Sequence, residues 1–128
     1  MKGGKIMLVV DKMSRTPIYE QIVEGIKREI ITGILKERDQ LPSIRELSVI
    51  LSTNPNTVQK AFMELDRAGI ILSTPGRGCF VADNAVENIR EGLKSKIDEI
   101  KELAKTLANA GIDEKTVLEA VKSAYKAK

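Results

Sequence analysis

Residues 41–62 of the chain read LPSIRELSVILSTNPNTVQKAF. Within this stretch Ser43 can cap a helix, because its hydroxyl accepts from the backbone three residues later while the Glu46 side chain reaches back to the Ser43 amide. Apolar residues at positions 44, 47, 50 and 51 supply one face for burial. The pattern predicts a short helix over about residues 44–51.

A second helix is expected after almost no linker. Asn54 can cap it, and Pro55 suits the first helical position, where the missing amide hydrogen has no helical partner in any case. Its buried face is expected to contain residues at the spacing i, i+3, i+4 and i+7, namely Val58, Ala61, Phe62 and Leu65. Gly69 then ends the helix. Two short helices joined by a turn of three or four residues form a helix-turn-helix.

The sequence upstream predicts one further helix and a short strand. Thr16 can cap a helix over about residues 17–32, with Pro17 as its first residue and isoleucines recurring every four positions up to Gly33. Before it, the five-residue apolar run 6–10 is expected to form a strand. This run is far too short to cross a membrane.

The sequence downstream changes from helical to extended periodicity. Apolar runs at 70–72 and 79–82 enclose the turn-forming residues 74–78, which predicts a β-hairpin with Arg77 at its tip. A helix-turn-helix followed by such a hairpin is a winged helix. The expected fold class is therefore mainly α with a small β wing, an α+β arrangement.

From position 84 onward the chain is expected to form two more helices. Apolar residues recur at steps of three and four over about 22 residues, Gly111 ends this first long helix, and Asp113 caps the last one. Two helices cannot build a core alone. We expect residues 1–83 to form a winged helix-turn-helix domain and residues 84–128 to form a two-helix dimerisation segment, with the alternative that the apolar stripe packs on its own winged helix.

Composition excludes several classes of function. The 128 residues include no His and a single Cys, which removes His-dependent catalysis and Cys/His zinc sites. The formal net charge is +3, and all of it falls in residues 1–82, where 12 Lys and Arg face 9 Asp and Glu, because residues 83–128 contain 9 of each. A single Cys fits a reducing compartment, so we expect a cytoplasmic protein. Because no set of catalytic or metal-binding residues is found, we also expect that it is not an enzyme and needs no cofactor or metal. Cys79 itself is expected to be a buried filler.

The outward face of the helix that begins at Pro55 points to DNA. Its first turns present Asn56, Thr57, Gln59 and Lys60 after the cap Asn54, with no acidic side chain before Glu64. Amides can pair with adenine edges, Thr can touch a thymine methyl group, and Lys reaches guanine or phosphate. The alternative is that the amides and the hydroxyl only cap the helix.

Two arginines support the same interpretation. Arg45 lies in the first turn of its helix, where a cation opposes the helix dipole, so an external anion such as a DNA phosphate would compensate it. Arg77 lies between Gly76 and Gly78, which let the backbone approach another surface while Arg enters a minor groove or binds phosphate. The alternatives are a surface ion pair for Arg45 and an ordinary turn at Arg77.

Four segments, PIYEQI (17–22), LPSIREL (41–47), NPNTVQKA (54–61) and GRGCFV (76–81), resemble the DNA-binding domain of the GntR family of bacterial transcription regulators. The segment NPNTV and the short tail resemble the YtrA subfamily. The resemblance implies a homodimeric repressor of its own operon, often beside ABC transporter genes, that binds an inverted-repeat operator. Other branches have Arg at the positions of Pro55 and Gln59, so their base preferences do not transfer.

These observations together define two sets of candidate residues. The residues expected to contact DNA are Ser43, Arg45, Asn54, Asn56, Thr57, Gln59, Lys60, Arg77 and Gly78. The residues expected to meet a second copy are Leu93, Ile97, Ile100, Ala104 and Leu107. Two alternatives stay open: a winged-helix module for protein interaction, and a small-molecule sensor whose ligand would bind at the dimer interface.

Overall fold

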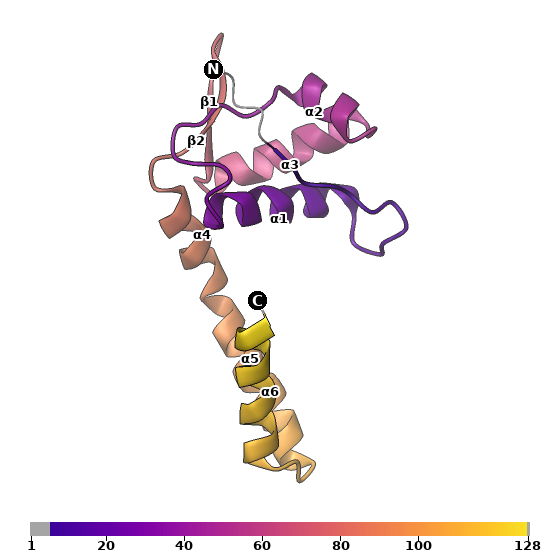
Figure 1. Ribbon diagram of the computed structural model, residues 1–128, viewed down its shortest axis with the longest axis vertical. Helices are drawn as coiled ribbons and strands as arrows, with labels where there is room; N and C mark the ends of the chain where they lie inside the picture. Colours follow the sequence, from indigo (N-terminus) through magenta and orange to yellow (C-terminus); the bar gives the residue numbers. More distant parts are fainter. Residues whose placement is uncertain (1–5, 128) are drawn as a thin grey trace. The chain divides into compact units, whose positions relative to one another are not determined.

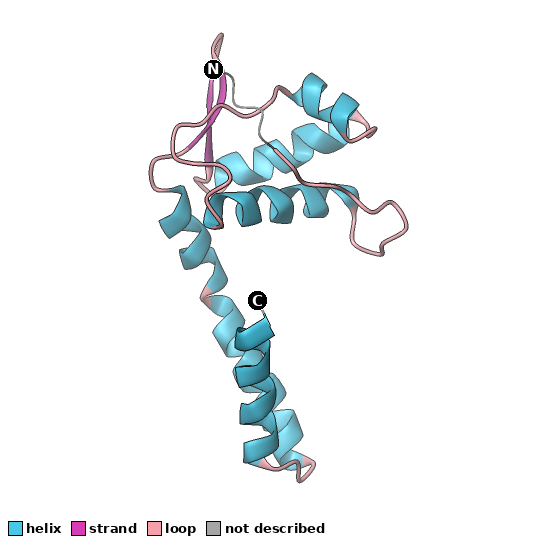
Figure 2. Ribbon diagram, viewed as in Figure 1, coloured by secondary structure: helices cyan, strands magenta, loops and turns pink. Residues whose placement is uncertain are grey.

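The computed structural model of the protein describes residues 6–127. It consists of six helices and a two-stranded antiparallel sheet (Figures 1 and 2), which confirms the expected fold class, mainly α with a small β wing. In chain order the elements are α1 (Ile18–Ile31), α2 (Ile44–Ile50), α3 (Pro55–Arg67), β1 (Ile71–Thr74), β2 (Gly78–Val81), α4 (Ala85–Leu93), α5 (Ser95–Asn109) and α6 (Glu114–Ala127). The chain divides into two compact units, Met1–Gly92 and Leu93–Lys128, which are described separately below.

The core of the first unit forms where α1, α2 and α3 meet beside the sheet. Most of the apolar faces predicted for the three helices are buried, with Ile22 and Ile26 from α1, Leu47 from α2, and Val58 and Leu65 from α3 all inaccessible to solvent. The prediction was wrong for Ile50, the last residue of α2, which is 59% exposed. Helix α3 packs against both of the other helices and against β1. Aliphatic burial of this kind is the main stabilising term, at about 25 cal/mol for each Å² removed from water.

The wing is a hairpin whose register places Ile71 opposite Val81 and Thr74 opposite Gly78. The segment before α2 adds a third, partial strand: Gln40 forms a bridge with Phe80, and the Leu41 amide donates to the Cys79 carbonyl at 2.8 Å. This pairing ties the base of the wing to the approach to α2. Cys79 is buried in the wing, as expected for a filler residue.

The apolar run Ile6–Val10 lies in an extended conformation but is not a strand, so that prediction was wrong. It lies along α1 and not along a sheet edge: the Met7 amide donates to Glu29 Oε2 at 2.9 Å, and Leu8 lies over Gly25. The alternation of half-buried and exposed side chains arises because one side of the segment rests on the helix. Alternation of apolar and exposed side chains shows that one side of an extended segment is covered, and here a helix covers it instead of a neighbouring strand.

Helix α1 begins one residue later than predicted. Pro17, and not Thr16, is its N-cap, and no side chain caps the helix. Gln21 Nε2 donates to the Thr16 carbonyl at 2.8 Å, and the Thr16 amide donates to Ser14 Oγ at 3.0 Å. Thr16 is therefore engaged in the loop before the helix.

Helix α4 packs with the first unit although it lies within the segment expected to dimerise. Ala85 and Ile89 are buried in the core, and Asn88 Nδ2 donates to the Gly69 carbonyl at 2.8 Å. The long helix predicted from residue 86 onward is interrupted at Lys94, between α4 and α5. Gly92, a poor helix former, lies just before this interruption and helps to explain it.

The second unit contains α5 and α6, joined by a turn at Gly111, whose φ of +83° ends α5 as predicted. No residue of either helix is buried. The exposed side chains include many large apolar ones, which is unusual for the surface of a monomeric protein. Within residues 6–127, no helix combines the length and the apolarity needed to cross a bilayer.

Candidate nucleic-acid interface

The start of α2 is fixed by a complete capping box. The Ser43 hydroxyl accepts from the Glu46 amide at 3.0 Å, and the Ser43 amide donates to Glu46 Oε1 at 2.8 Å. Substituting such a cap costs about 0.5–2 kcal/mol, so this end of the helix is well defined. It presents Arg45 to solvent in the first turn, as the sequence predicted.

The start of α3 is capped by Asn54, whose Oδ1 accepts from the Asn56 amide at 2.8 Å, with Pro55 in the first helical position. The expected cap is therefore confirmed. The side chains of Asn56 and Gln59 are exposed, and together with Lys60 they line a shallow groove along the helix. The first turn contains no acidic residue. This face offers hydrogen-bond donors, acceptors and positive charge.

Not every predicted contact residue faces solvent equally. Thr57 is half-buried, and Lys60 extends its ammonium group over the ring of Tyr19 in α1, 3.9 Å from the ring centroid. Sequence reasoning missed Tyr19, because the two residues are far apart in the chain and no local pattern links them. The contact places the Lys60 charge between α3 and α1.

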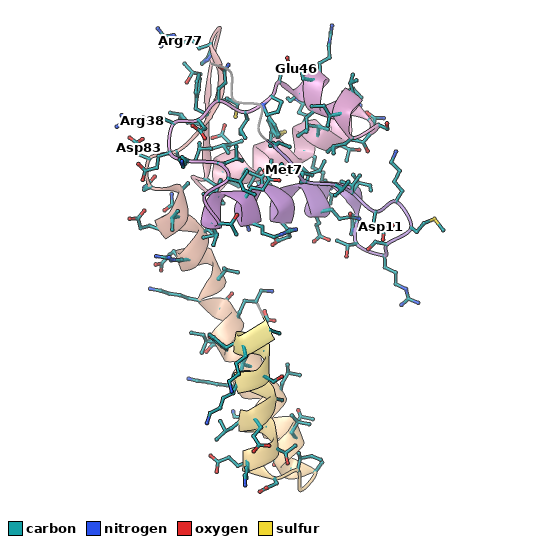
Figure 3. All side chains as sticks on the ribbon, viewed as in Figure 1. Met7, Asp11, Arg38, Glu46, Arg77 and Asp83 are labelled. Carbon is teal, nitrogen blue, oxygen red and sulfur yellow. The ribbon has the colours of Figure 1, made fainter. Side chains whose placement is uncertain are left out.

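The tip of the wing is the third part of the candidate interface. Arg77 is exposed between Gly76 and Gly78, whose φ angles are +78° and +120°, and its side chain extends away from the hairpin in Figure 3. Gln40 supports this tip, since its Nε2 donates to the Arg77 carbonyl at 3.1 Å. A Cβ atom at Gly78 would come within 2.6 Å of the same Nε2. Gln40 is therefore a supporting residue that the sequence did not identify.

A cleft of about 750 Å³ lies between the start of α2 and the wing. It is lined by both polar and apolar side chains, and it brings Ser43 and Arg45 next to Gly78. The exposed apolar residues Val49 and Ile50 also line it. Two of the three predicted segments thus meet at one cleft, while the α3 residues line a groove of their own.

Two groups near the wing have shifted pKa values. Arg38 and Asp83 form an exposed ion pair, with Nε 2.9 Å from Oδ1, and the hydrogen bond to Asp83 raises the pKa of Arg38 (Figure 3). Burial raises the pKa of the Cys79 thiol, and the hydrogen bond between Cys79 and Ser73, whose Oγ lies 3.8 Å from the sulfur, acts in the opposite direction. The net shift favours the protonated thiol, which is the less reactive form.

The residues expected to meet a second copy lie on the helices after the winged helix. Leu93 is the last residue of α4, and Ile97, Ile100, Ala104 and Leu107 follow along α5. Ala104 is half-buried, and the other four side chains are between 38% and 57% exposed. None of these five side chains is buried.

A capped helix pair followed by a two-stranded wing, with amides and cations exposed at the start of its second helix, defines a winged helix-turn-helix DNA-binding protein. Residues 18–81 match the model of the bacterial regulatory proteins of the gntR family. The chain belongs to this GntR family and is a DNA-binding transcriptional regulator, not an enzyme.

The relatives extend the similarity beyond the winged helix. The chain is 44% identical over 108 residues to the HTH-type transcriptional repressor YtrA of Bacillus subtilis (strain 168), covering 84% of this chain and 83% of the relative. A GntR family transcriptional regulator from Listeria monocytogenes superposes with a TM-score of 0.71 at 31% identity, over 89% of this chain and 98% of the other. The AraR DNA-binding domain in complex with operator ORE1 superposes with a TM-score of 0.52 at 28% identity, over 59% and 93% of the two chains.

Proposed function

We propose that the protein is a homodimeric repressor that binds an inverted-repeat operator upstream of its own operon in the cytoplasm. The observation that carries this proposal is the exposed start of α3, where amides and a cation occur without a carboxylate before Glu64. In this arrangement α3 enters a major groove and the wing lies on the adjacent minor groove or backbone. The AraR domain bound to its operator and the repressor named YtrA support the proposal.

The proposed contacts divide into base readers and phosphate binders. Asn56 and Gln59 can each form two hydrogen bonds with an adenine edge, and Thr57 can touch a thymine methyl group. Arg45, at the start of α2, and Arg77, at the tip of the wing, are placed to bind phosphates or a narrow minor groove. Ser43 and Gly78 contribute through the backbone that they fix. Asn54 caps α3 with Oδ1 and keeps its Nδ2 hydrogens for an acceptor on the DNA.

The second unit supports the dimer. Helices α5 and α6 have no buried residue, yet α5 exposes the apolar residues Ile97, Ile100 and Leu107 beside Ala104, and Leu93 at the end of α4 is exposed as well. A helix pair of this kind gains stability only by covering its apolar stripe, and a second copy offers a matching one. We therefore propose that, of the expected segment 84–128, residues 93–128 serve dimerisation, since α4 packs with the first unit. Two-fold symmetry would place the half-sites one helical turn, or a multiple of it, apart.

The identity of the regulated genes is proposed from the family resemblance. We propose that the operon controlled by this regulator includes its own gene and genes for an ABC transporter. Mapping the DNA that the protein protects upstream of its own gene tests this proposal directly. Protection confined to unrelated genes would contradict it.

Operator binding is tested with a labelled duplex from the region upstream of the gene, with a scrambled duplex of equal length for comparison. Arg45→Ala and Arg77→Ala should each weaken binding by about tenfold or more, since a hydrogen bond to a charged group contributes about 1.5–3 kcal/mol. Arg90→Ala, an exposed residue of α4, is the matched control and should leave affinity unchanged. Equal affinity for the two duplexes would refute sequence-specific binding.

The dimer is tested separately by sedimentation velocity. Ile100→Asp places a charge on the apolar stripe and should convert the dimer to monomer at micromolar concentration. Thr106→Asp, also on α5 but away from the stripe, should leave the dimer intact. A wild-type protein that sediments as a monomer at all concentrations would contradict the proposed assembly.

A further inference from the structure

The loop before α1 has a defined internal structure. Residues 11–16 form a turn in which the Ser14 amide donates to the Asp11 carbonyl at 3.2 Å and the Met13 amide donates to Asp11 Oδ1 at 2.9 Å. The side chains of the loop are all exposed. Hydrogen bonds within the loop order its backbone in the absence of a partner, which lowers the entropy cost of binding one.

A single side chain, Gln21 in α1, fastens both ends of the loop. The Asp11 amide donates to Gln21 Oε1 at 2.7 Å, and Gln21 Nε2 donates to the carbonyls of Asp11 and Thr16 at 3.0 and 2.8 Å. Gln21 is half-buried beside the core. The loop is thus fixed to the first turn of α1.

A second attachment joins the loop to the helix-turn-helix. The Lys12 ammonium group donates to the carbonyl of Ser52, which lies in the turn between α2 and α3. Figure 1 shows the loop before α1 and the α2–α3 turn at the same end of the first unit, and Asp11 marks the loop in Figure 3. The loop therefore lies beside the start of α3, the segment proposed to enter the major groove.

Positive side chains gather at this end of the unit. Lys12 and Arg15 come from the loop, and Lys60 extends from α3 to the ring of Tyr19 in the first turn of α1. Arg15 is exposed and forms no hydrogen bond or ion pair within residues 6–127. The loop also contains the carboxylate of Asp11, whose Oδ1 accepts from the Met13 amide.

We propose that residues 11–16 form a further DNA contact, in which Lys12 and Arg15 bind backbone phosphates beside the groove that α3 occupies. This inference rests on the proposed function. It concerns a surface outside residues 18–81, the part of the chain that matches the family model. Because phosphates carry no sequence information, the loop should strengthen binding to operator and to unrelated duplex alike.

The inference predicts a specific salt dependence. Each phosphate neutralised by a cation contributes about 0.9 to the slope of log K against log salt. The double variant Lys12→Gln, Arg15→Gln should therefore lower the slope by about 1.8 and reduce affinity by the same factor for operator and scrambled duplex. Lys27→Gln, Arg28→Gln near the end of α1 removes the same charge and should keep the wild-type slope.

Arg15→Gln alone is the decisive variant, because Lys12 also supports the turn at Ser52 and its loss alters the fold locally. Arg15 has no internal partner, so its variant should unfold at the wild-type temperature while the slope falls by about 0.9. An unchanged slope for Arg15→Gln would overturn the inference. A wild-type protein that does not prefer operator to scrambled DNA would instead overturn the proposed function, so the two failures are distinguishable.

Discussion

The ammonium group of Lys60 lies 3.9 Å from the centroid of the Tyr19 ring. Lys60 is in the second turn of α3 and Tyr19 is in the first turn of α1, so the contact joins the proposed recognition helix to the helix it packs against. A cation above an aromatic face is stabilised by about 0.5–1 kcal/mol at an exposed site. The ring therefore limits the directions that the Lys60 side chain can take.

This contact predicts that Tyr19 acts on DNA binding through Lys60. Tyr19→Leu should weaken operator binding by about two- to fivefold, the equivalent of 0.5–1 kcal/mol, while Tyr19→Phe should bind as the wild type does. In a Lys60→Met background the Tyr19→Leu change should have no further effect. Fluorescence anisotropy titrations of the wild type and the four variants measure this, and losses that simply add would show that the two residues act independently.

The wing glycines should differ in their tolerance of alanine. Gly78 has a φ of +120° and a Cβ there would lie 2.6 Å from Gln40 Nε2, whereas Gly76, at +78°, has no atom within 4 Å of such a Cβ. Gly76→Ala should cost about 1–2 kcal/mol from the backbone conformation alone. Gly78→Ala should cost more, because Gln40 must also leave the Arg77 carbonyl. Urea denaturation measures both, and an equal loss would contradict the proposed role of Gln40.

The hydrogen bond from Asn88 to the Gly69 carbonyl should stabilise the attachment of α4 to the first unit. Asn88→Ala removes a 2.8 Å contact and should lower the free energy of unfolding by about 0.5–1.5 kcal/mol. Asn109→Ala, at the exposed end of α5, is the matched control. Thermal unfolding followed by circular dichroism distinguishes them, and identical melting curves for the two variants would disprove the prediction.

Cys79 should react slowly with thiol reagents while the protein is folded. Burial raises the pKa of its thiol above the ordinary value, so little thiolate forms at pH 8, and it is the only Cys in the sequence. The reaction with a chromogenic disulfide should be at least about tenfold slower in buffer than in denaturing urea. Reaction at the unfolded rate would show that the wing opens readily.

The same shift has a consequence for stability. Since the folded-state pKa of Cys79 lies above the unfolded-state pKa, its contribution to stability is complete below about pH 8.5 and is lost as the pH rises through the folded-state pKa. Cys79→Ala should remove this part of the alkaline decline. The free energies of unfolding of the wild type and Cys79→Ala, measured from pH 7 to pH 10, test this: the advantage of the wild type over the variant should shrink as the pH rises.

Much of the first unit could be predicted from short-range patterns. The caps at Ser43 and Asn54 and the apolar spacing of the helices depend on residues within one or two turns of each other, so the sequence displays them directly. The extended segment from Ile6 could not be placed, since its alternation indicates a surface but not which one. The interruption at Lys94 was also missed, because apolar spacing continues across it.

The supporting residues of the candidate site were beyond sequence reasoning for a related physical reason. Gln40 contacts a carbonyl 37 positions away, and Lys12 contacts one 40 positions away. Neither belongs to a local motif, and glutamine and lysine are common on any surface. Only the three-dimensional arrangement distinguishes them from other exposed polar residues.

The cap at Asn54 restricts what that side chain can read. Its Oδ1 already accepts from the Asn56 amide, which uses one of the two acceptor sites of that oxygen, while both Nδ2 hydrogens remain for an outside partner. An amide held in this way has more capacity to donate, to a purine N7, guanine O6, thymine O4 or a phosphate oxygen, than to accept from the amino groups of cytosine or adenine. Capping the helix therefore biases this position toward operator bases that present an acceptor.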